Sequence, residues 1–384
     1  MSKGYLPQIN PRILRWCREE AGFDLDLAAH KIGITAFDLT SCEAGTKFLT
    51  IAKLRSAARI YNRPPALFYF QDVPESLKMP VFRRLPENED EPISPELRLE
   101  VRRIYEKRGY AMELSSYGAD FEWNFIGSLN LHQDPEEVGM VLRNILGVSK
   151  EYPIKKIDSY KSFNFWRHTV ESRGILVFQA TSVPIHEMRG LSIAEKPYPV
   201  IAVNRKDPPE ARAFSLLHEF CHIMLGKSTM CEVRFRNDSH NDEVFCNHVA
   251  GAALVPREKL LSMIKEKIGE PKEEWNEKEL HTLSSFFGVS REVILRRLLI
   301  LNLTSSIYYG YKRSEWKKER EDRKPKGFGE RGHERILRKE GSTYTKLILN
   351  AFENKAITKS ELSKMLGMKL RHLPQLEQLV FDKR

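Results

Sequence analysis

The chain has 384 residues, of which 41% are hydrophobic and 30% charged, and its formal net charge is +10. This length suggests two or three domains, and no apolar run approaches the roughly 18 to 20 residues that a membrane span needs. The five cysteines form no CxxC pair, which argues against a disulfide scaffold or a zinc ribbon, and the N-terminal residues lack the apolar stretch of a signal peptide. We therefore expect a cytoplasmic protein with no membrane partner, whose positive charge favours nucleic acid or an acidic partner.

The N-terminal region is rich in helix signals. Residues 10–72 read as a small bundle of short helices divided by glycines, and Thr35 is placed to cap one of them. Residues 73–95 are rich in proline and charge and are predicted to form a linker. Beyond it, helical patterns enclose three short β-prone runs between residues 174 and 204, separated by turn residues, which predicts a small sheet.

The last third of the chain contains two stretches that look like helix-turn-helix units, at residues 280–302 and 357–380. Between them lies a run dense in both basic and acidic side chains, which predicts a solvated helix or a linker. The expected fold class is therefore mainly α with a small β-sheet (α+β), with an N-terminal bundle, a central domain and a C-terminal helical region. The predicted divisions are 1–72, 73–95 (linker), 96–305, 306–340 (charged linker) and 341–384.

One predicted helix combines an apolar surface with a cluster of ionisable side chains. Residues 208–226 are apolar on most sides, which predicts a buried helix, yet they include His218, Glu219 and His222. The two histidines are four residues apart, so their rings leave one face of the helix and can bind one metal ion. Glu219 can then take a proton from a zinc-bound water and pass it to the leaving amine. The alternative is a pair of core histidines held by hydrogen bonds.

A catalytic zinc ion usually takes three protein ligands, and the third is expected on a nearby element. Glu243 begins the next predicted helix, and Asn247 lies one turn later on the same face. Glu243 is therefore the candidate third ligand, and Asn247 is the candidate that orients a ligand histidine from behind. The alternative for Glu243 is a charge that favours its helix N-terminus. His240 and His248 are competing ligands, for which a surface or packed role is the simpler interpretation.

The stretches LLHEFCHIML and EVFCNHVAGAALVP resemble the ImmA/IrrE metallopeptidases, whose pattern is a HELGH helix followed by E-x-x-A-N-x-F-A-x-x-L-L-x-P. The resemblance covers about residues 165–305. It implies a gluzincin-like peptidase domain with Zn2+ as cofactor, in which His218 and His222 are metal ligands, Glu219 is the general base and Glu243 is the third ligand.

Two departures from the family pattern are cysteines. Cys221 stands where the family usually has Gly, and Cys246 stands where it usually has Ala. Both replacements are small residues that a core can accept. Two cysteines near a metal also raise the idea of redox sensing, with inert packing as the alternative.

Residues 10–72 resemble the XRE-type helix-turn-helix domain, through LAAHKIGITAFDLTSCEAGT and the run that follows it. Proteins that join these two modules are prokaryotic and phage-linked regulators or antitoxins, which control DNA-bound repressors or partner toxins, often by proteolysis. The start of the recognition helix carries Phe37 and Asp38, which suit base edges and phosphates poorly. Binding of double-stranded DNA and a dimerisation or partner-docking role therefore both remain open. The candidate DNA contacts are Lys31, Thr35, Lys47, Lys53 and Arg55.

Together these features predict a zinc-dependent endopeptidase that acts as a regulator and cleaves a specific protein, such as a repressor or a toxin or antitoxin partner, targeted by its helix-turn-helix domain. The alternative is an antitoxin or transcriptional repressor that binds a partner protein, DNA or both and has a structural or vestigial zinc site. Helix-turn-helix proteins often pair to match two half-sites, so a homodimer is one expectation. The candidates for stabilising the oxyanion are Arg189, Tyr198 and His281.

Overall fold

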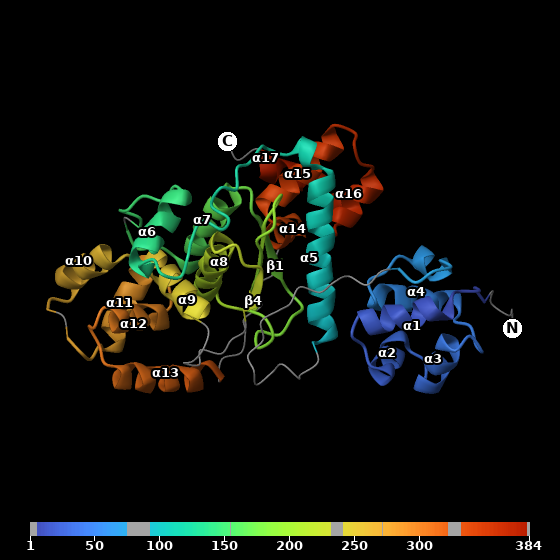
Figure 1. Ribbon diagram of the computed structural model, residues 1–384, viewed down its shortest axis with the longest axis horizontal. Coiled ribbons are helices and arrows are strands. Elements are labelled where there is room, and N and C mark those ends of the chain that lie inside the picture. Colours follow the sequence, from blue (N-terminus) through green and yellow to red (C-terminus); the bar gives the residue numbers. More distant parts are fainter. Residues whose placement is uncertain are drawn as a thin grey trace. The chain divides into compact units, whose positions relative to one another are not determined.

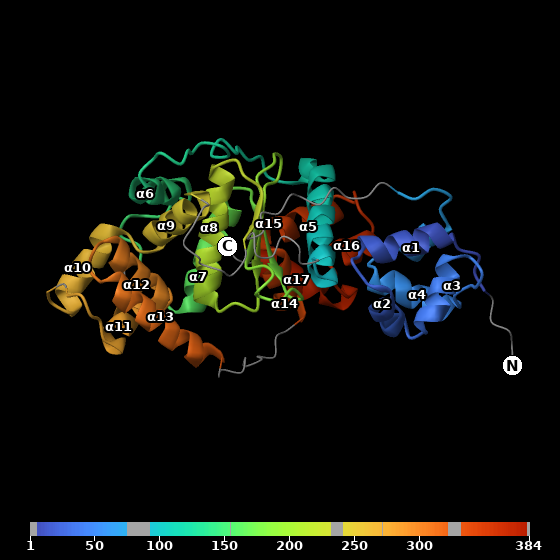
Figure 2. The same cartoon turned by 60° about the horizontal axis from the view of Figure 1, so that its bottom comes forward.

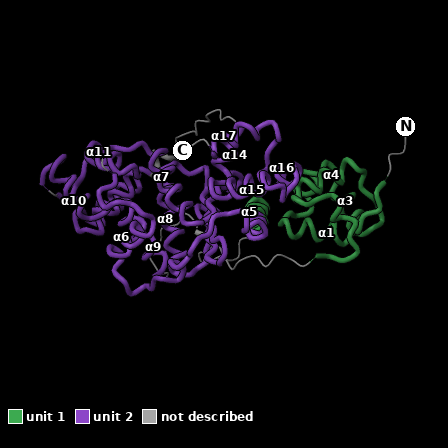
Figure 3. Tube along the Cα trace, turned by 90° about the horizontal axis from the view of Figure 1, so that it is seen from above, with its two compact units in different colours: residues 1–106 green, residues 107–384 purple. Residues whose placement is uncertain are grey.

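The computed structural model describes residues 6–74, 93–153, 155–231, 241–270, 272–321 and 332–381. The chain divides into two compact units, residues 1–106 and residues 107–384 (Figure 3). The division falls inside helix α5 (Pro95–Glu113), whereas the predicted linker at 73–95 lies mostly outside the described residues. The fold is mainly helical with a small sheet, as predicted. Among the described residues, no helix combines the length and the apolar character that a membrane crossing needs.

The first unit is a bundle of short helices around its own apolar core. Its elements are α1 (Pro11–Glu20), α2 (Leu25–Ile32), α3 (Ala36–Glu43), α4 (Ile51–Ile60) and the 3-10 helix η1 (Pro65–Tyr69). The predicted cap at Thr35 is confirmed, because its hydroxyl accepts a hydrogen bond from the backbone N–H of Asp38 at 3.1 Å. Buried side chains such as Ile13, Leu39 and Tyr61 fill the core.

The second unit is built on a sheet whose strands, among the described residues, run in the order β1-β3-β2-β4. β1 (Leu176–Ala180) is parallel to β3 (Val200–Asn204), and β2 (Gly190–Ile193) is antiparallel to β3 and to β4 (Thr229–Cys231). In the register, Gly190 lies opposite Val203 on one side and Cys231 on the other. The three predicted strand runs are present, whereas β4 was not predicted.

Helices cover both faces of β1, all of whose residues are buried. Neighbouring residues of a strand point to opposite faces. Val177 accordingly joins the core formed with α7 (Ser159–Glu171) and α8 (Pro209–Met224), whereas the ring of Phe178 packs edge-on against Tyr344, with centroids 5.5 Å apart. Tyr344 belongs to α15 (Ser342–Glu353). Figures 1 and 2 show α7 and α8 on one side of the strands and α14 and α15 on the other.

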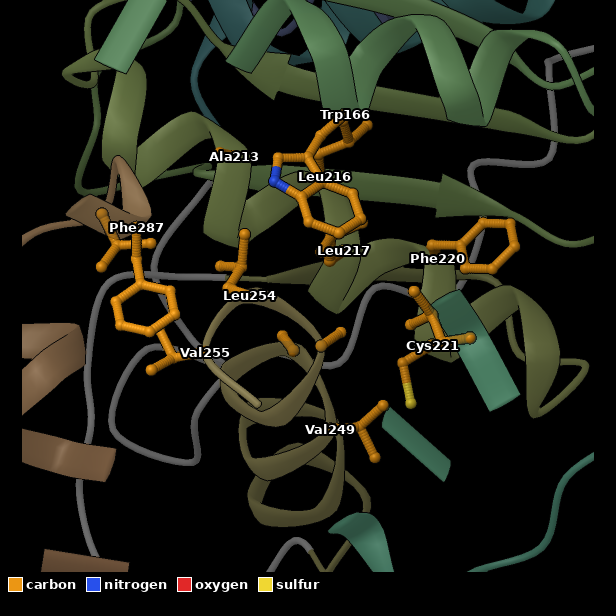
Figure 4. Packing of buried hydrophobic residues seen from close by; sticks show 14 of the residues in the cluster. Trp166, Ala213, Leu216, Leu217, Phe220, Cys221, Val249, Leu254, Val255 and Phe287 are labelled. Carbon is orange, nitrogen blue, oxygen red and sulfur yellow. The ribbon is translucent and has the colours of Figure 1, made fainter. Parts of the chain in front are cut away.

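The main apolar core surrounds α8. Figure 4 shows Trp166 of α7, Leu216 and Phe220 of α8, Val249 of α9 and Phe287 of α11 in one cluster. Burial of this much apolar surface is the main source of stability for the unit. The other helices of this region are α6 (Pro135–Ile145), α9 (Asn241–Leu254), α10 (Arg257–Lys267), α11 (Glu277–Phe287), α12 (Arg291–Ile300) and α13 (Ser306–Glu321), with the 3-10 helix η3 (Ser115–Tyr117) after α5.

The structure differs from the predicted charged linker at 306–340. That segment contains α13 and α14 (Gly332–Glu340), and α14 packs on β1. The density of charged residues suggested a linker, but most of the charged side chains of α14 are exposed or half-buried. Only Glu340 is fully buried among them, and it forms an ion pair with Lys107 of α5. The helices that follow belong to the same compact unit rather than to a separate one. They are α15, α16 (Lys359–Met365), η4 (Leu370–His372) and α17 (Leu373–Phe381).

Candidate metal centre

Helix α8 runs through the middle of the core and carries the predicted HExxH residues. It contacts α7, α9, β2 and β3, and both histidines and Glu219 are buried. After its C-cap at Leu225, Gly226 takes a left-handed conformation with φ of 70°, which glycine adopts without strain, so the chain turns away there. The helix therefore holds its polar residues in a site that only neighbouring elements can complete.

The structure brings three predicted ligands together. His218 Nε2 lies 3.2 Å from Glu243 Oε2, and His222 Nε2 lies 3.2 Å from Glu243 Oε1. The two histidine Nε2 atoms are 3.1 Å apart. Glu243 reaches them from the first turn of α9, which packs directly against α8. Two helices thus present two nitrogen donors and a carboxylate around one point.

These three residues have the donor set and spacing of a zinc site. Nitrogen and oxygen donors lie about 2.0 to 2.1 Å from zinc, so two donors of a tetrahedral ion stand about 3.3 Å apart. The observed separations of 3.1 to 3.2 Å are close to that value. Among the described residues, this group is the one whose ligand atoms gather within 4.8 Å of one another. The arrangement therefore fits three protein ligands with one open position.

The charges of the site support one another. Burial acts to lower the pKa of His218, but the adjoining carboxylate of Glu243 raises it above its ordinary value, with a smaller contribution from Glu219. Burial acts to raise the pKa of Glu243, but the charges and hydrogen bonds of His218 and His222 hold it well below its ordinary value. Glu243 is therefore ionised, as a metal ligand must be.

Glu219 is fully buried and is held against the sheet. Its Oε2 accepts a hydrogen bond from the hydroxyl of Thr229 at 3.1 Å, and Ser192 Oγ lies 2.8 Å from that hydroxyl. Its Oε1 has no hydrogen-bond partner among the described residues. Gly190 leaves room for the carboxylate, because a Cβ at that position would come within 2.8 Å of Glu219 Cγ. A buried carboxylate oxygen without a partner is costly, which indicates a site that awaits a ligand or water.

Residues 170–299 match the family model of the IrrE N-terminal-like domain, Peptidase_M78. We call this segment the IrrE-like domain. It contains the whole sheet together with α8 and α9, and so all three candidate ligands and Glu219. The match supports the resemblance to the ImmA/IrrE family and a metallopeptidase-like domain. Comparison with curated proteins gives no match.

Behind the ligand histidines, the structure differs from the sequence prediction. Asn247 was predicted to orient a ligand, but in the described part of the chain the side chain that lies behind His222 is that of Cys246, whose Sγ is 3.6 Å from His222 Nδ1. Cys246, the residue before Asn247, lies on the face of α9 that packs against α8 and is fully buried. In the IrrE-like domain the thiol therefore takes the place expected of Asn247. Cys221 is buried in the apolar core, as the packing interpretation expects.

The competing ligands and the oxyanion candidates have other surroundings. His248 Nε2 lies 2.7 Å from Glu136 Oε1, and His240 is outside the described residues. Arg189 lies 3.9 Å from Asp207, Tyr198 packs edge-on against Trp123, and His281 is 3.3 Å from the hydroxyl of Ser285. None of these contacts gives the four described residues a role at the candidate metal centre. Among the described residues, no contact identifies an oxyanion donor.

Several of the predicted DNA contacts serve the first unit itself. Thr35 caps α3, Lys47 is paired with an aspartate of that helix at 2.6 Å, and Lys53 donates to backbone carbonyls at the end of α2. Lys31 and Arg55 are exposed. The exposed start of α3 is dominated by an aromatic ring, because 80% of Phe37 is accessible to solvent.

Proposed function

We propose that this protein is a zinc-dependent endopeptidase that acts as a regulator by cleaving a specific protein, such as a repressor or a toxin or antitoxin partner. The observation that carries the proposal is the trio of donors from His218, His222 and Glu243, 3.1 to 3.2 Å apart, beside the buried carboxylate of Glu219. The family match over residues 170–299 supports metallopeptidase chemistry in general.

The side chains have distinct roles in this proposal. The three donors would hold zinc, which would supply an acidified water and an electrophile for the scissile carbonyl. Oε1 of Glu219 would accept the proton of the attacking water and pass it to the leaving amide nitrogen. The hydroxyl of Thr229 would keep Oε2 in place, so that Oε1 alone exchanges protons. Cys246 would fix the orientation of the His222 ring from behind.

The first unit is proposed to target the enzyme. Its resemblance to XRE-type domains supports a recognition role, and its helices expose Phe37, Leu27 and Ile51 together with Lys31 and Arg55. Such a mixed apolar and basic surface suits a protein partner at least as well as DNA.

Metal content and cleavage together test the proposal. We expect about one zinc ion per purified chain, retained in Glu219→Gln and lost in the double variant His218→Ala/His222→Ala. New protein N-termini that arise in cells producing the wild-type chain, but not in cells producing Glu219→Gln, would identify the substrate. Glu210→Gln, in the first turn of the same helix, is the matched control and should behave as the wild type.

Two outcomes would contradict it. A wild-type chain that binds no metal after zinc is supplied would remove the basis for hydrolysis. Unchanged biological activity in Glu219→Gln would show that the protein acts by binding a partner, as an antitoxin or repressor does.

A further inference from the structure

The C-terminal helices carry a second recognition feature, far along the chain from the metal centre. Thr358 and Glu361 cap the start of α16 reciprocally, with the backbone N–H of Thr358 donating to Glu361 Oε2 at 2.7 Å. After α16, Gly367 turns the chain with a φ of 59°, and η4 continues directly into α17. The stretch that the sequence marked at 357–380 therefore is a helix, a tight turn and a second helical element.

The second element has a buried face and a polar face. Leu376 and Val380 are buried, whereas Arg371, Gln375 and Gln378 are exposed. Gln375 and Gln378 are three residues apart, which places them on one side of α17, and Arg371 lies four residues before Gln375 in η4. Arginine and glutamine are side chains that make paired hydrogen bonds to guanine and adenine in the major groove. The exposed face thus offers the chemistry of base recognition.

Positive charges gather beside this face. The ring of His372 lies against the start of α14, since a Cβ at Gly332 would stand 2.5 Å from its Cε1. Burial first, and then the charges of Arg371, His333, Arg335 and Lys369, lower the pKa of His372 below its ordinary value. The charged groups that lower the pKa of His372 are all basic. Lys369 and Arg335 are exposed at this place.

Two acidic groups near this face are engaged with basic partners, and a third is half-buried. Residues 332–381 contain nine lysines and arginines against five glutamates and no aspartate. Glu334 lies 3.8 Å from Arg338 on the same helix, and Glu340 is buried against Lys107. Glu377 is half-buried, and burial raises its pKa. The exposed basic groups therefore face solvent with little neutralisation, and their surface is complementary to a polyanion.

We propose that η4 and α17 are a DNA-binding element, in which Arg335 and Lys369 contact phosphates and Arg371, Gln375 and Gln378 face the major groove of duplex DNA. This goes beyond the proposed peptidase activity and assigns DNA to the C-terminal helices rather than to the N-terminal bundle. The polar face of α17, with basic residues beside it, contrasts with the start of α3, where Phe37 is exposed and Asp38 is paired with Lys47.

Salt-dependent binding by the full chain is the first test. With a short fluorescent duplex between about 50 and 200 mM salt, log K should fall linearly with log salt. Arg335→Ala/Lys369→Ala should weaken binding roughly tenfold and reduce the slope by about 2, because two phosphate contacts are lost. Lys155→Ala/Lys156→Ala, which removes two exposed charges elsewhere in the same unit, is the matched control and should bind as the wild type does.

Sequence preference is the second test. Selection from a randomised duplex library should enrich a motif with the wild-type chain but not with Gln375→Ala/Gln378→Ala, whose salt slope should be unchanged. Zinc content and circular dichroism would verify that each variant is folded. The proposal is overturned if the wild-type chain binds no duplex, or if Lys31→Ala/Arg55→Ala abolishes binding while Arg335→Ala/Lys369→Ala does not. It is also overturned if an acidic peptide occupies this basic surface while the full chain still binds DNA with unchanged affinity, because the DNA would then bind elsewhere.

Discussion

Glu219 depends on the sheet for its position, although it belongs to α8. Thr229 donates its single hydroxyl hydrogen to Glu219 Oε2, so Ser192 must be the donor in its own bond to Thr229. Gly190, on the same strand as Ser192, provides the space that the carboxylate occupies. A side chain with three rotatable bonds is thereby confined to one orientation, which is what proton transfer at a fixed point requires.

Removing the Thr229 hydroxyl should slow catalysis without emptying the metal site. Thr229→Val keeps the shape of the side chain but loses a hydrogen bond to a charged group, which is worth about 1.5 to 3 kcal/mol. We expect kcat for the protein substrate to fall roughly 10- to 100-fold, with KM and zinc content unchanged. Thr229→Ser should restore most of kcat. If Thr229→Val cleaves as fast as the wild type, the hydroxyl does not position the base.

The sequence predicts the ligands better than their supports. His218 and His222 follow from a four-residue spacing within one helix, and Glu243 from its place at the start of the next. Thr229 and Cys246 are different, because their role exists only when β4 pairs with β2 and when α9 packs on α8. Cross-strand register and helix rotation are set by long-range packing, and the three residues of β4 are too few to show an alternating pattern in the sequence.

At the level of elements, the approach of α6 to α9 depends on one glycine. A Cβ on Gly139 would lie 2.7 Å from Ala252 Cβ and 3.1 Å from the backbone nitrogen of Ala253. The two helices therefore contact one another through backbone and methyl groups. Glu136, also on α6, adds paired hydrogen bonds to Arg297 of α12, at 2.5 and 2.8 Å. Burial acts to raise its pKa, but His248 and Arg297 lower it to about 2.

The close contact between α6 and α9 predicts that glycine-to-alanine substitutions at two positions change the stability in opposite directions. Gly139→Ala should destabilise the second unit by about 1 to 3 kcal/mol, because the added methyl forces α6 away from α9. Gly109→Ala, inside α5, meets no described atom within 4 Å and should stabilise that helix by about 0.5 to 1 kcal/mol. Urea unfolding of the two variants measures both changes. Equal effects would mean that the close contact between α6 and α9 does not exist in solution.

Charge composition explains why α14 was predicted to belong to a linker. Seven of its nine residues are polar or glycine, and the surrounding sequence is dense in lysine and arginine. What places the helix on β1 is a small set of buried contacts, in which Arg167 and Gln179 donate to the carbonyl of Arg338 and Lys107 pairs with Glu340. Such contacts join residues more than 150 positions apart and leave no local pattern in the sequence.

At the scale of the whole molecule, the second unit contains two features that lie far apart in the sequence. The metal centre on α8 and α9 and the proposed DNA-binding element of η4 and α17 belong to one compact unit, in which α7 and α8 lie on one side of the strands and α14 and α15 on the other. The sequence predicted a domain at 96–305 and a separate helical unit at 341–384, joined by a charged linker. Because α14 and α15 complete the burial of β1, the C-terminal helices are part of the fold that supports the metal centre.

Zinc should therefore stabilise one unit of the chain and not the other. Calorimetry of the full chain should show two transitions, since each unit has its own core. At free zinc about 1,000 times its Kd, binding adds about 4 kcal/mol to the unit that holds the site, which raises its Tm by roughly 10 °C. The transition of residues 1–106, which is identified with that fragment alone or with a destabilising variant in its core, should stay in place, and a chelator should reverse the shift. In His218→Ala/His222→Ala neither transition should move. A shift of both transitions in the wild type would mean that the two units unfold as one, and a shift of neither would mean that zinc is not bound by the folded site.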